Sequence, residues 1–222
     1  MKIINRALRF INRKRHSAGH GVHSQFAFEL IMNTIHTPYS YYSYQDNKNK
    51  LKQAGLENYS DIKYAKLLFR LTNRFNSKKI LEIGSGIGVN TLYLTASSKQ
   101  TKITCVEQEK EKIKNAQSLL ANKLENIILT EVLPINECRF DAIVWDLKQH
   151  SHKKDEVIEL ISKTIKSEGF VVINHINKGK ENKEVWQNTL QLKNLTMSFD
   201  LGAIGIGFFK TWLPKLNYDL YF

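Results

Sequence analysis

The sequence predicts an α/β fold: a mostly parallel β-sheet with helices on both faces, a C-terminal β-hairpin and an N-terminal helical extension. After residue 60, short apolar segments typical of strands alternate with segments whose apolar residues recur at helical spacing. Near the end of the chain, two strand patterns follow each other across a short connection that contains glycine, which is typical of a hairpin. Before residue 60, the patterns are those of helices and loops.

The strand and helix patterns alternate regularly in the second part of the chain. Strands are expected at residues 78–84, 102–108, 126–130, 140–146 and 169–175. Helices are expected at residues 61–75, with Ser60 as a possible N-cap, and at 89–97, 109–124, 155–165 and 183–192. The hairpin comprises residues 195–202 and 203–210, which meet at Gly202. Because helices join successive strands, the strands are expected to be parallel and the sheet to be covered on both faces.

Residues 1–59 are expected to form the helical extension, and residues 60–222 the main domain. The first helix of the extension is basic and amphipathic, and three apolar residues share one side of it: Ile4, Leu8 and Ile11. A second helix is expected at residues 26–35, followed by a tyrosine-rich loop at 38–50. The extension would form a lid on the substrate side, or its first helix would pack against a second subunit and make a homodimer.

Length and composition limit the classes of protein that fit. The chain has 222 residues, of which 42% are hydrophobic, enough for one domain with a packed core and a small appendage. The net charge of +12 favours anionic partners such as nucleic acid, although scattered lysines are also typical of a solvated surface. Cys105 and Cys138 lie in different expected elements, which argues against a disulfide or zinc framework. We expect a cytoplasmic protein, because neither a signal-peptide pattern nor a membrane-spanning apolar run occurs.

One segment carries the strongest functional signal: ILEIGSGIGVN, residues 80–90. Glycines at positions 84, 86 and 88 allow a sharp turn from strand to helix and let the backbone approach a ligand closely. Their spacing differs from the G-x-G-x-x-G of dinucleotide-binding folds, which disfavours an NAD-dependent dehydrogenase. With Glu82 in front, the segment resembles motif I of class I S-adenosylmethionine (SAM) dependent methyltransferases, usually written E/D-x-G-x-G-x-G.

The resemblance covers about residues 60–213 and implies a Rossmann-like, seven-stranded sheet that binds SAM. In this family an acid that ends the second strand binds the ribose hydroxyls of SAM, and Glu107 lies there in this chain. The resemblance implies the following cofactor-binding residues: Glu82, Gly84, Ser85, Gly86, Gly88, Asn90, Glu107, Gln108, Glu131 and Asp146. Two plainer interpretations stay open, because Glu107 could be a solvated residue at a helix start and Glu82 could only order the loop.

Asp146 and His175 are the candidate catalytic residues. Ligand clefts of open α/β sheets form at the C-terminal ends of the strands, so Asp146 should face the cleft, unless it caps a helix or pairs with Lys148. Asp146 matches the acid that catechol-type O-methyltransferases use, often to bind magnesium together with an Asp-Asn pair at the end of the fifth strand. Here that pair is Asn174-His175, which leaves one carboxylate, so no metal is expected. His175 is then a general base or a structural histidine, and His150 is a further candidate base.

Three functions are compatible with these residues. The preferred one is a SAM-dependent methyltransferase that acts on an oxygen or nitrogen of a small molecule. The second is modification of RNA or the ribosome, suggested by the positive charge and by tyrosines that could stack on bases: Tyr39, Tyr41, Tyr42 and Tyr44. The third is a non-catalytic SAM-binding module. The segment HGVHSQFAFEL also resembles a group of class I methyltransferases from Bacteroidetes that open with a GVHSPF-like motif.

Overall fold

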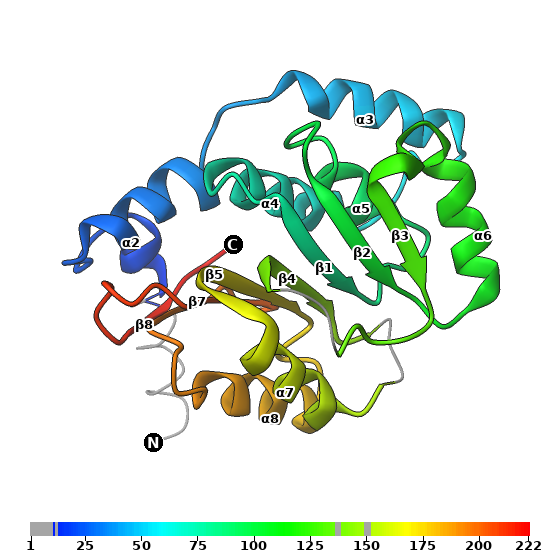
Figure 1. Cartoon of the computed structure of the whole chain (residues 1–222). Helices are drawn as coiled ribbons and strands as arrows, with labels where there is room; N and C mark the ends of the chain where they lie inside the picture. Colours follow the sequence, from blue (N-terminus) through cyan, green and yellow to red (C-terminus); the bar gives the residue numbers. More distant parts are fainter. Residues whose placement is uncertain (1–10, 12, 136–138, 149–151) are drawn as a thin grey trace.

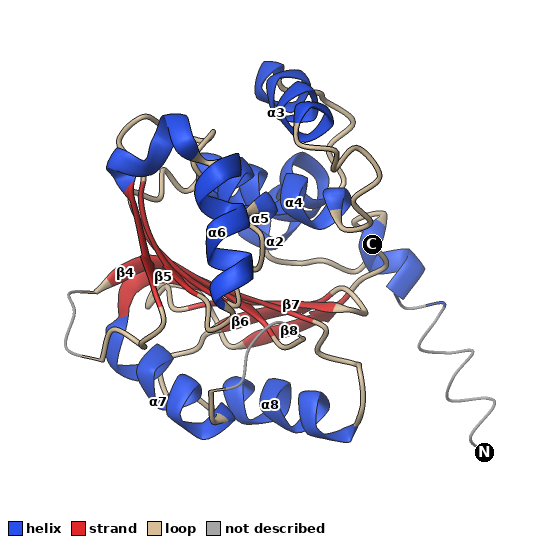
Figure 2. Ribbon diagram, turned by 90° about the vertical axis from the view of Figure 1, so that its right-hand side faces the viewer, coloured by secondary structure: helices blue, strands red, loops and turns tan. Residues whose placement is uncertain are grey.

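The computed structural model describes residues 11, 13–135, 139–148 and 152–222, which form three layers around one β-sheet (Figure 1). One face of the sheet carries helices α2 (Gln25–Leu30), α4 (Ile62–Arg74), α5 (Val89–Leu94) and α6 (Lys110–Leu119) (Figure 2). The other face carries α7 (Lys154–Thr164) and α8 (Lys180–Leu190). This arrangement confirms the predicted α/β fold.

The sheet has eight strands in the order β3-β2-β1-β4-β5-β7-β6-β8. Their bounds are β1 (Lys79–Ile83), β2 (Lys102–Val106), β3 (Ile127–Thr130), β4 (Phe140–Asp146), β5 (Ile165–Asn174), β6 (Met197–Asp200), β7 (Ile204–Phe208) and β8 (Leu216–Asp219). Strands β6 and β7 are antiparallel and form the predicted hairpin. Strand β8 is one more than the seven expected, and it pairs in parallel with β6 at the sheet edge. It buries only Tyr218, so its apolar pattern is too weak to indicate a strand.

The register of the central strands brings the candidate residues to one edge of the sheet. Strand β1 lies between β2 and β4, and Ile83 pairs with Val106 on one side and with Trp145 on the other. The residues that follow these three positions are Gly84, Glu107 and Asp146. Because the three strands are parallel, all three residues lie at the C-terminal edge, where open α/β sheets bind ligands.

The segment predicted as a tyrosine-rich loop is largely a helix, so that prediction was wrong. Helix α3 (Tyr42–Gln53) buries a narrow stripe at helical spacing: Tyr44, Asn47 and Leu51. The Tyr44 ring lies 5.3 Å from the Phe69 ring of α4, centre to centre. Packing of this stripe onto the domain, rather than the polar composition of the segment, therefore decides its structure.

The rest of the N-terminal extension is helical where it is described. Residues 11 and 13–17 are helical, and a π-helical turn, η1 (Ile31–Ile35), continues α2. The predictions for Ile4 and Leu8 lie outside the described residues. Helix α4 begins after Asp61 rather than Ser60, and Asp61 makes no side-chain capping bond. Among the described residues, no helix is both long enough and apolar enough to cross a membrane.

Candidate active site

The glycine turn between β1 and α5 has a backbone that requires glycine. Gly84, Gly86 and Gly88 have φ angles of 78°, 57° and 86°, which lie in the left-handed region. Gly88 is also the N-cap of α5, and a Cβ built there would lie 3.0 Å from Leu120 Cδ1 and 3.1 Å from Ala116 Cβ. The turn therefore depends on glycine both for its backbone conformation and for its close packing against α6.

The carboxylate of Glu107 points at this turn. Its Oε2 accepts a hydrogen bond from Gly86 N at 2.8 Å, and its Oε1 accepts from Gln108 N at 2.9 Å and from Glu109 N at 3.1 Å. The residue is only 3% exposed, so the alternative of a solvated glutamate does not hold. Each carboxylate oxygen has two lone pairs, so Oε2 can accept a further hydrogen bond beside the turn.

Several buried polar atoms around the turn have no hydrogen-bond partner among the described residues. They are Glu82 Oε1, Ser85 Oγ, Asn90 Oδ1 and Tyr64 OH. A buried polar group without a partner costs about 1–3 kcal/mol, so unpaired atoms gathered at one place indicate a ligand that would pair with them. Glu82, Ser85 and Asn90 belong to the predicted site, whereas Tyr64 was missed by the sequence analysis.

Glu82 lies inside the protein, and only one of its two carboxylate oxygens has a hydrogen-bond partner among the described residues. Its Oε2 accepts hydrogen bonds from Thr91 Oγ1 at 2.6 Å and from Cys105 Sγ at 3.7 Å. Burial raises the pKa of Glu82 to about 7; these two hydrogen bonds oppose the rise, and the carboxylates of Asp146 and Glu107 add to it. The Glu82 side chain therefore changes its charge near neutral pH.

Tyr64 approaches the site from outside the β-sheet. It lies in the first turn of α4, and α4 leads into β1 through the short connection 75–78, so this turn lies near the C-terminal end of β1. Burial raises the pKa of Tyr64, and the nearby carboxylates of Asp146 and Glu82 raise it further, which is consistent with this position. The pKa of Tyr59 is also raised, to about 12. Burial is the largest cause, and the charges of Asp61, Asp146 and Glu82 add to it. No motif marks either tyrosine in the sequence.

Asp146 and His175 contact each other at the ends of β4 and β5. His175 Nδ1 lies 3.0 Å from Asp146 Oδ1, which also accepts from Lys148 N at 2.8 Å, while Oδ2 accepts from Asn174 Nδ2 at 3.3 Å. Burial raises the pKa of Asp146, but hydrogen bonds from His175, Lys148 N and Asn174 outweigh it and bring the pKa below its ordinary value. Asp146 is thus a buried, charged partner for the imidazole.

The backbone of His175 is strained. Its φ of 64° lies in the left-handed region, which costs a residue with a side chain on the order of 1–3 kcal/mol. The loop after it is held at several points: Lys178 N and Asn182 Nδ2 donate to His175 O, both at 3.0 Å, and Ile176 N donates to Ala203 O at 3.0 Å. Such strain persists only where the surroundings enforce it, as they do here.

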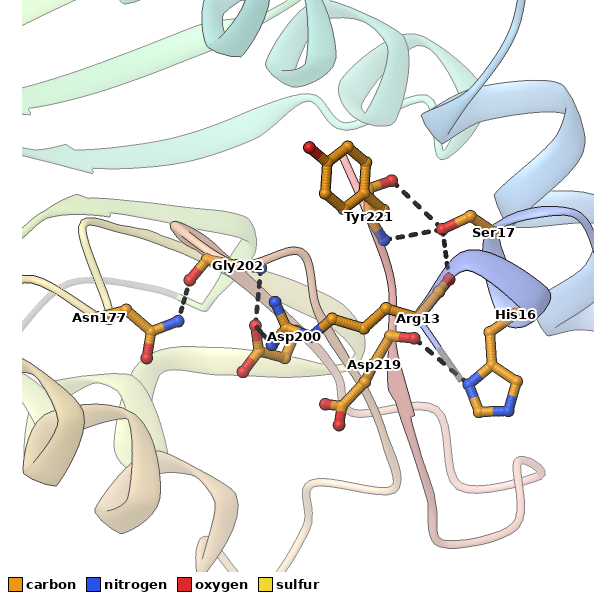
Figure 3. A network of polar contacts seen from close by, with 8 residues as sticks. All are labelled: Arg13, His16, Ser17, Asn177, Asp200, Gly202, Asp219 and Tyr221. Atoms are coloured by element: carbon orange, nitrogen blue, oxygen red, sulfur yellow. Dashed lines mark hydrogen bonds and ion pairs between the residues drawn. The ribbon is translucent and has the colours of Figure 1, made fainter. Parts of the chain in front are cut away.

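A network of polar contacts connects this loop to both ends of the described chain (Figure 3). Asn177 Nδ2 donates to Gly202 O, and Gly202 N donates to Asp200 Oδ1 at 2.7 Å. Arg13 Nη2 forms an ion pair with the same oxygen of Asp200 at 3.0 Å. Near Arg13, Ser17 Oγ accepts from Tyr221 N at 2.7 Å. The N-terminal helix is therefore tied to the turn of the β6–β7 hairpin, and through it to the loop after His175.

A cavity of about 490 Å³ adjoins this loop, and we call it the His175 cavity. Its lining comprises His175, Asn177, Lys178, Gly202 and Ala203. A volume of a few hundred Å³ is typical of sites for small molecules.

The other residues predicted for the site, Gln108, Glu131 and His150, are not placed at the glycine turn or at the Asp146–His175 pair by any described side-chain contact. Gln108 N donates to Glu107, but the Gln108 side chain is directed to His152, with Nε2 3.5 Å from Nδ1. Glu131 is exposed on the segment after β3. His150 lies outside the described residues. No group of three His, Cys, Asp or Glu side chains suited to a metal ion occurs in the described ranges.

Comparisons with known proteins identify the family. A family model described as a methyltransferase domain matches residues 75–212, whereas no curated protein matches the sequence.

Similar solved structures include the SAH-bound Podospora anserina methyltransferase PaMTH1, where SAH is S-adenosylhomocysteine (TM-score 0.60, 12% identity, 77% of this chain and 89% of that one covered). A second is the Bacillus cereus O-methyltransferase in complex with SAH (TM-score 0.55, 15% identity, 78% and 93% covered). A third is the O-methyltransferase TomG from Streptomyces achromogenes in complex with SAM (TM-score 0.56, 15% identity, 78% and 91% covered). At these identities the likeness concerns the fold. The chain therefore belongs to the methyltransferase domain family, which confirms the predicted class, a SAM-dependent methyltransferase.

Proposed function

We propose that the chain methylates an oxygen or nitrogen atom of a small molecule that binds in the His175 cavity. One observation carries the proposal: His175 lines this cavity and its Nδ1 contacts Asp146, and Asp146 also belongs to the sheet edge with the glycine turn and its unpaired polar atoms. The two halves of a methyl-transfer site, one for the donor and one for the acceptor, would thus meet at Asp146.

The donor half fits SAM by its chemistry. Glu107, beside Gly86, would accept hydrogen bonds from ribose hydroxyls. Glu82, Ser85 and Asn90 would pair their free polar atoms with the ammonium and carboxylate of the methionine part. When bound, SAM supplies a methyl group already activated by its sulfonium. The chain then has to align the acceptor and exclude water, and all of these residues, Gly86 of the turn included, are less than a tenth exposed.

His175 would act as the general base. Its Nδ1 is bound to Asp146, which leaves Nε2 as the nitrogen that can take the proton of an acceptor hydroxyl or amine. The charged Asp146 would hold the imidazole in the required tautomer and stabilise its protonated form. A positioned base contributes about 10²–10⁴-fold to the rate.

The test is methyl transfer from radiolabelled SAM to fractionated small-molecule extracts. We expect labelled product with the wild type, a loss of about 100-fold or more in His175→Gln, and unchanged SAH affinity in that variant. His23→Gln serves as the matched control, because His23 is exposed. SAH binding without transfer to any fraction would instead favour the non-catalytic SAM-binding module. Full activity of His175→Gln would contradict the role of the base.

RNA modification is the less favoured alternative. Of the four tyrosines that suggested it, Tyr44 is 7% exposed, and the Tyr41 ring packs 4.9 Å from that of Phe69. Tyr39 and Tyr42 are 75% and 97% exposed and stay available for stacking. RNA binding that falls steeply with salt would support this alternative.

Four expectations from the sequence remain predictions. They are the homodimer, the cytoplasmic location, the relation to the Bacteroidetes group, and the lid role of residues 1–59 over the domain 60–222.

A further inference from the structure

Two adjoining cavities lie next to α3, and the smaller one reaches Ile87 of the glycine turn. They are formed by α3, the end of α5 and the segment after it, α6 and the short helix η2 (Ala121–Asn126), and measure about 560 and 800 Å³. Four residues line both cavities: Lys50, Gln53, Asn122 and Lys123. None of the residues assigned above to SAM or to catalysis lines either one.

Three lysines and two acids line this space, and the two residues with charged side chains that line both cavities are lysines. Lys50 and Lys123 are half-buried, whereas the other charged residues of the larger cavity, Asp46, Lys99 and Glu125, are exposed. Lys123 Nζ donates to Thr95 Oγ1 at 3.1 Å, and within the described part of the chain neither lysine forms an ion pair. Burial lowers the pKa of Lys123 and the charge of Lys50 lowers it further, while Asp46 opposes this. The two ammonium groups therefore repel each other across a space that a counter-ion would occupy favourably.

Two residues in the lining of the larger cavity have unpaired polar atoms. Asn47 is only 2% exposed and lines the larger cavity, yet its Nδ2 has no partner among the described residues. Ser43 Oγ, also on α3 and in the lining, is unpaired in the same way. An amide N–H₂ can only donate, so the missing partner of Asn47 is an acceptor.

We propose that these cavities form a second ligand site, which binds the phosphate group of a small molecule. A phosphate offers several acceptor oxygens and a negative charge, which match two ammonium groups, an amide donor and a hydroxyl. The volumes suit a small molecule rather than an extended nucleic-acid strand. The site shares none of the residues assigned to SAM, although Ile87 of the glycine turn lines the smaller cavity, and it adds a binding function to the methyltransferase.

Calorimetric titration with inorganic pyrophosphate and with ribose 5-phosphate tests the proposal. We expect the wild type to bind at least one of them, and Lys50→Gln and Lys123→Gln to bind about tenfold more weakly, as expected for one lost charge-assisted hydrogen bond. Lys48→Gln is the matched control, because Lys48 is exposed on the same helix and lines neither cavity, and it should bind like the wild type.

The outcomes separate the possible sources of the phosphate. Binding of ribose 5-phosphate would support a phosphorylated metabolite, and binding of pyrophosphate alone would support an inorganic anion. The proposal is overturned if neither probe binds at millimolar concentration, or if Lys48→Gln weakens binding as much as the other two variants. Displacement of bound pyrophosphate by short RNA would also overturn it, because a strand would then occupy the site.

Discussion

The Glu82→Gln substitution is expected to stabilise the protein without SAM, and to do so more strongly as the pH rises. Glu82 is 1% exposed, and its bond from Thr91 Oγ1 can be kept by the glutamine carbonyl. What the substitution removes is a buried carboxylate whose pKa burial raises to about 7. The protein therefore no longer has to hold a poorly solvated charge above neutral pH.

Proton linkage gives the sign and the size of the effect. Glu82 ionises near its ordinary 4.5 in the unfolded chain and near 7 in the folded protein, so the folded protein holds the extra proton between these values. The free energy of unfolding of the wild type consequently falls as the pH rises through this window. The rise from 4.5 to about 7 corresponds to a total loss of about 3 kcal/mol, which the glutamine variant does not suffer.

Urea unfolding of both proteins at pH 5, 6, 7 and 8 measures this difference. We expect the difference in the free energy of unfolding, variant minus wild type, to increase by about 2–3 kcal/mol from pH 5 to pH 8. A difference that stays constant with pH would refute the reasoning. SAH titration of the variant adds a second readout: affinity about tenfold lower fits a contact with the ligand ammonium, and unchanged affinity fits a residue that only orders the loop.

Two further substitutions test the turn and the residue missed in the sequence. Gly88→Ala is expected to lower the free energy of unfolding in urea by about 1–3 kcal/mol, because of its φ and its contacts with α6. Gly55→Ala has a similar φ but open space around it, so an equal loss there would exclude the packing explanation. Tyr64→Phe is expected to weaken SAH binding about tenfold and to leave binding of 5′-methylthioadenosine, which lacks the amino-acid part, unchanged. If the affinities for both ligands fell equally, the Tyr64 hydroxyl would not contact the amino-acid part of SAH.

The elements with dense apolar patterns were predictable from sequence. Strands β1 and β4 bury nearly every residue, and β5 buries every residue from 169 to 174, so their apolar runs are unambiguous. The glycine turn was predictable because its information is local: three glycines, with a strand before them and a helix after them. Glu107 followed from its place at the end of β2, and its bond from Gly86 N depends only on the adjacent pairing of β1 and β2.

Features that depend on distant contacts were not predictable. Helix α3 forms because Tyr44 and Leu51 pack on the domain, and no strong apolar repeat marks it. Tyr64 reaches the site only because α4 folds back along β1. The left-handed conformation of His175 is enforced by its bonds to Asp146 and within the following loop, which the sequence does not encode locally.

The most direct measurement is a calorimetric titration of SAH into the wild type and into Glu107→Gln, with Glu57→Ala, an exposed acid, as control. If the glycine turn and Glu107 together hold the adenosyl group, the wild type and the control bind SAH and Glu107→Gln binds it at least about tenfold more weakly. Absence of binding to the folded wild type, or equal affinity in all three proteins, would contradict this account.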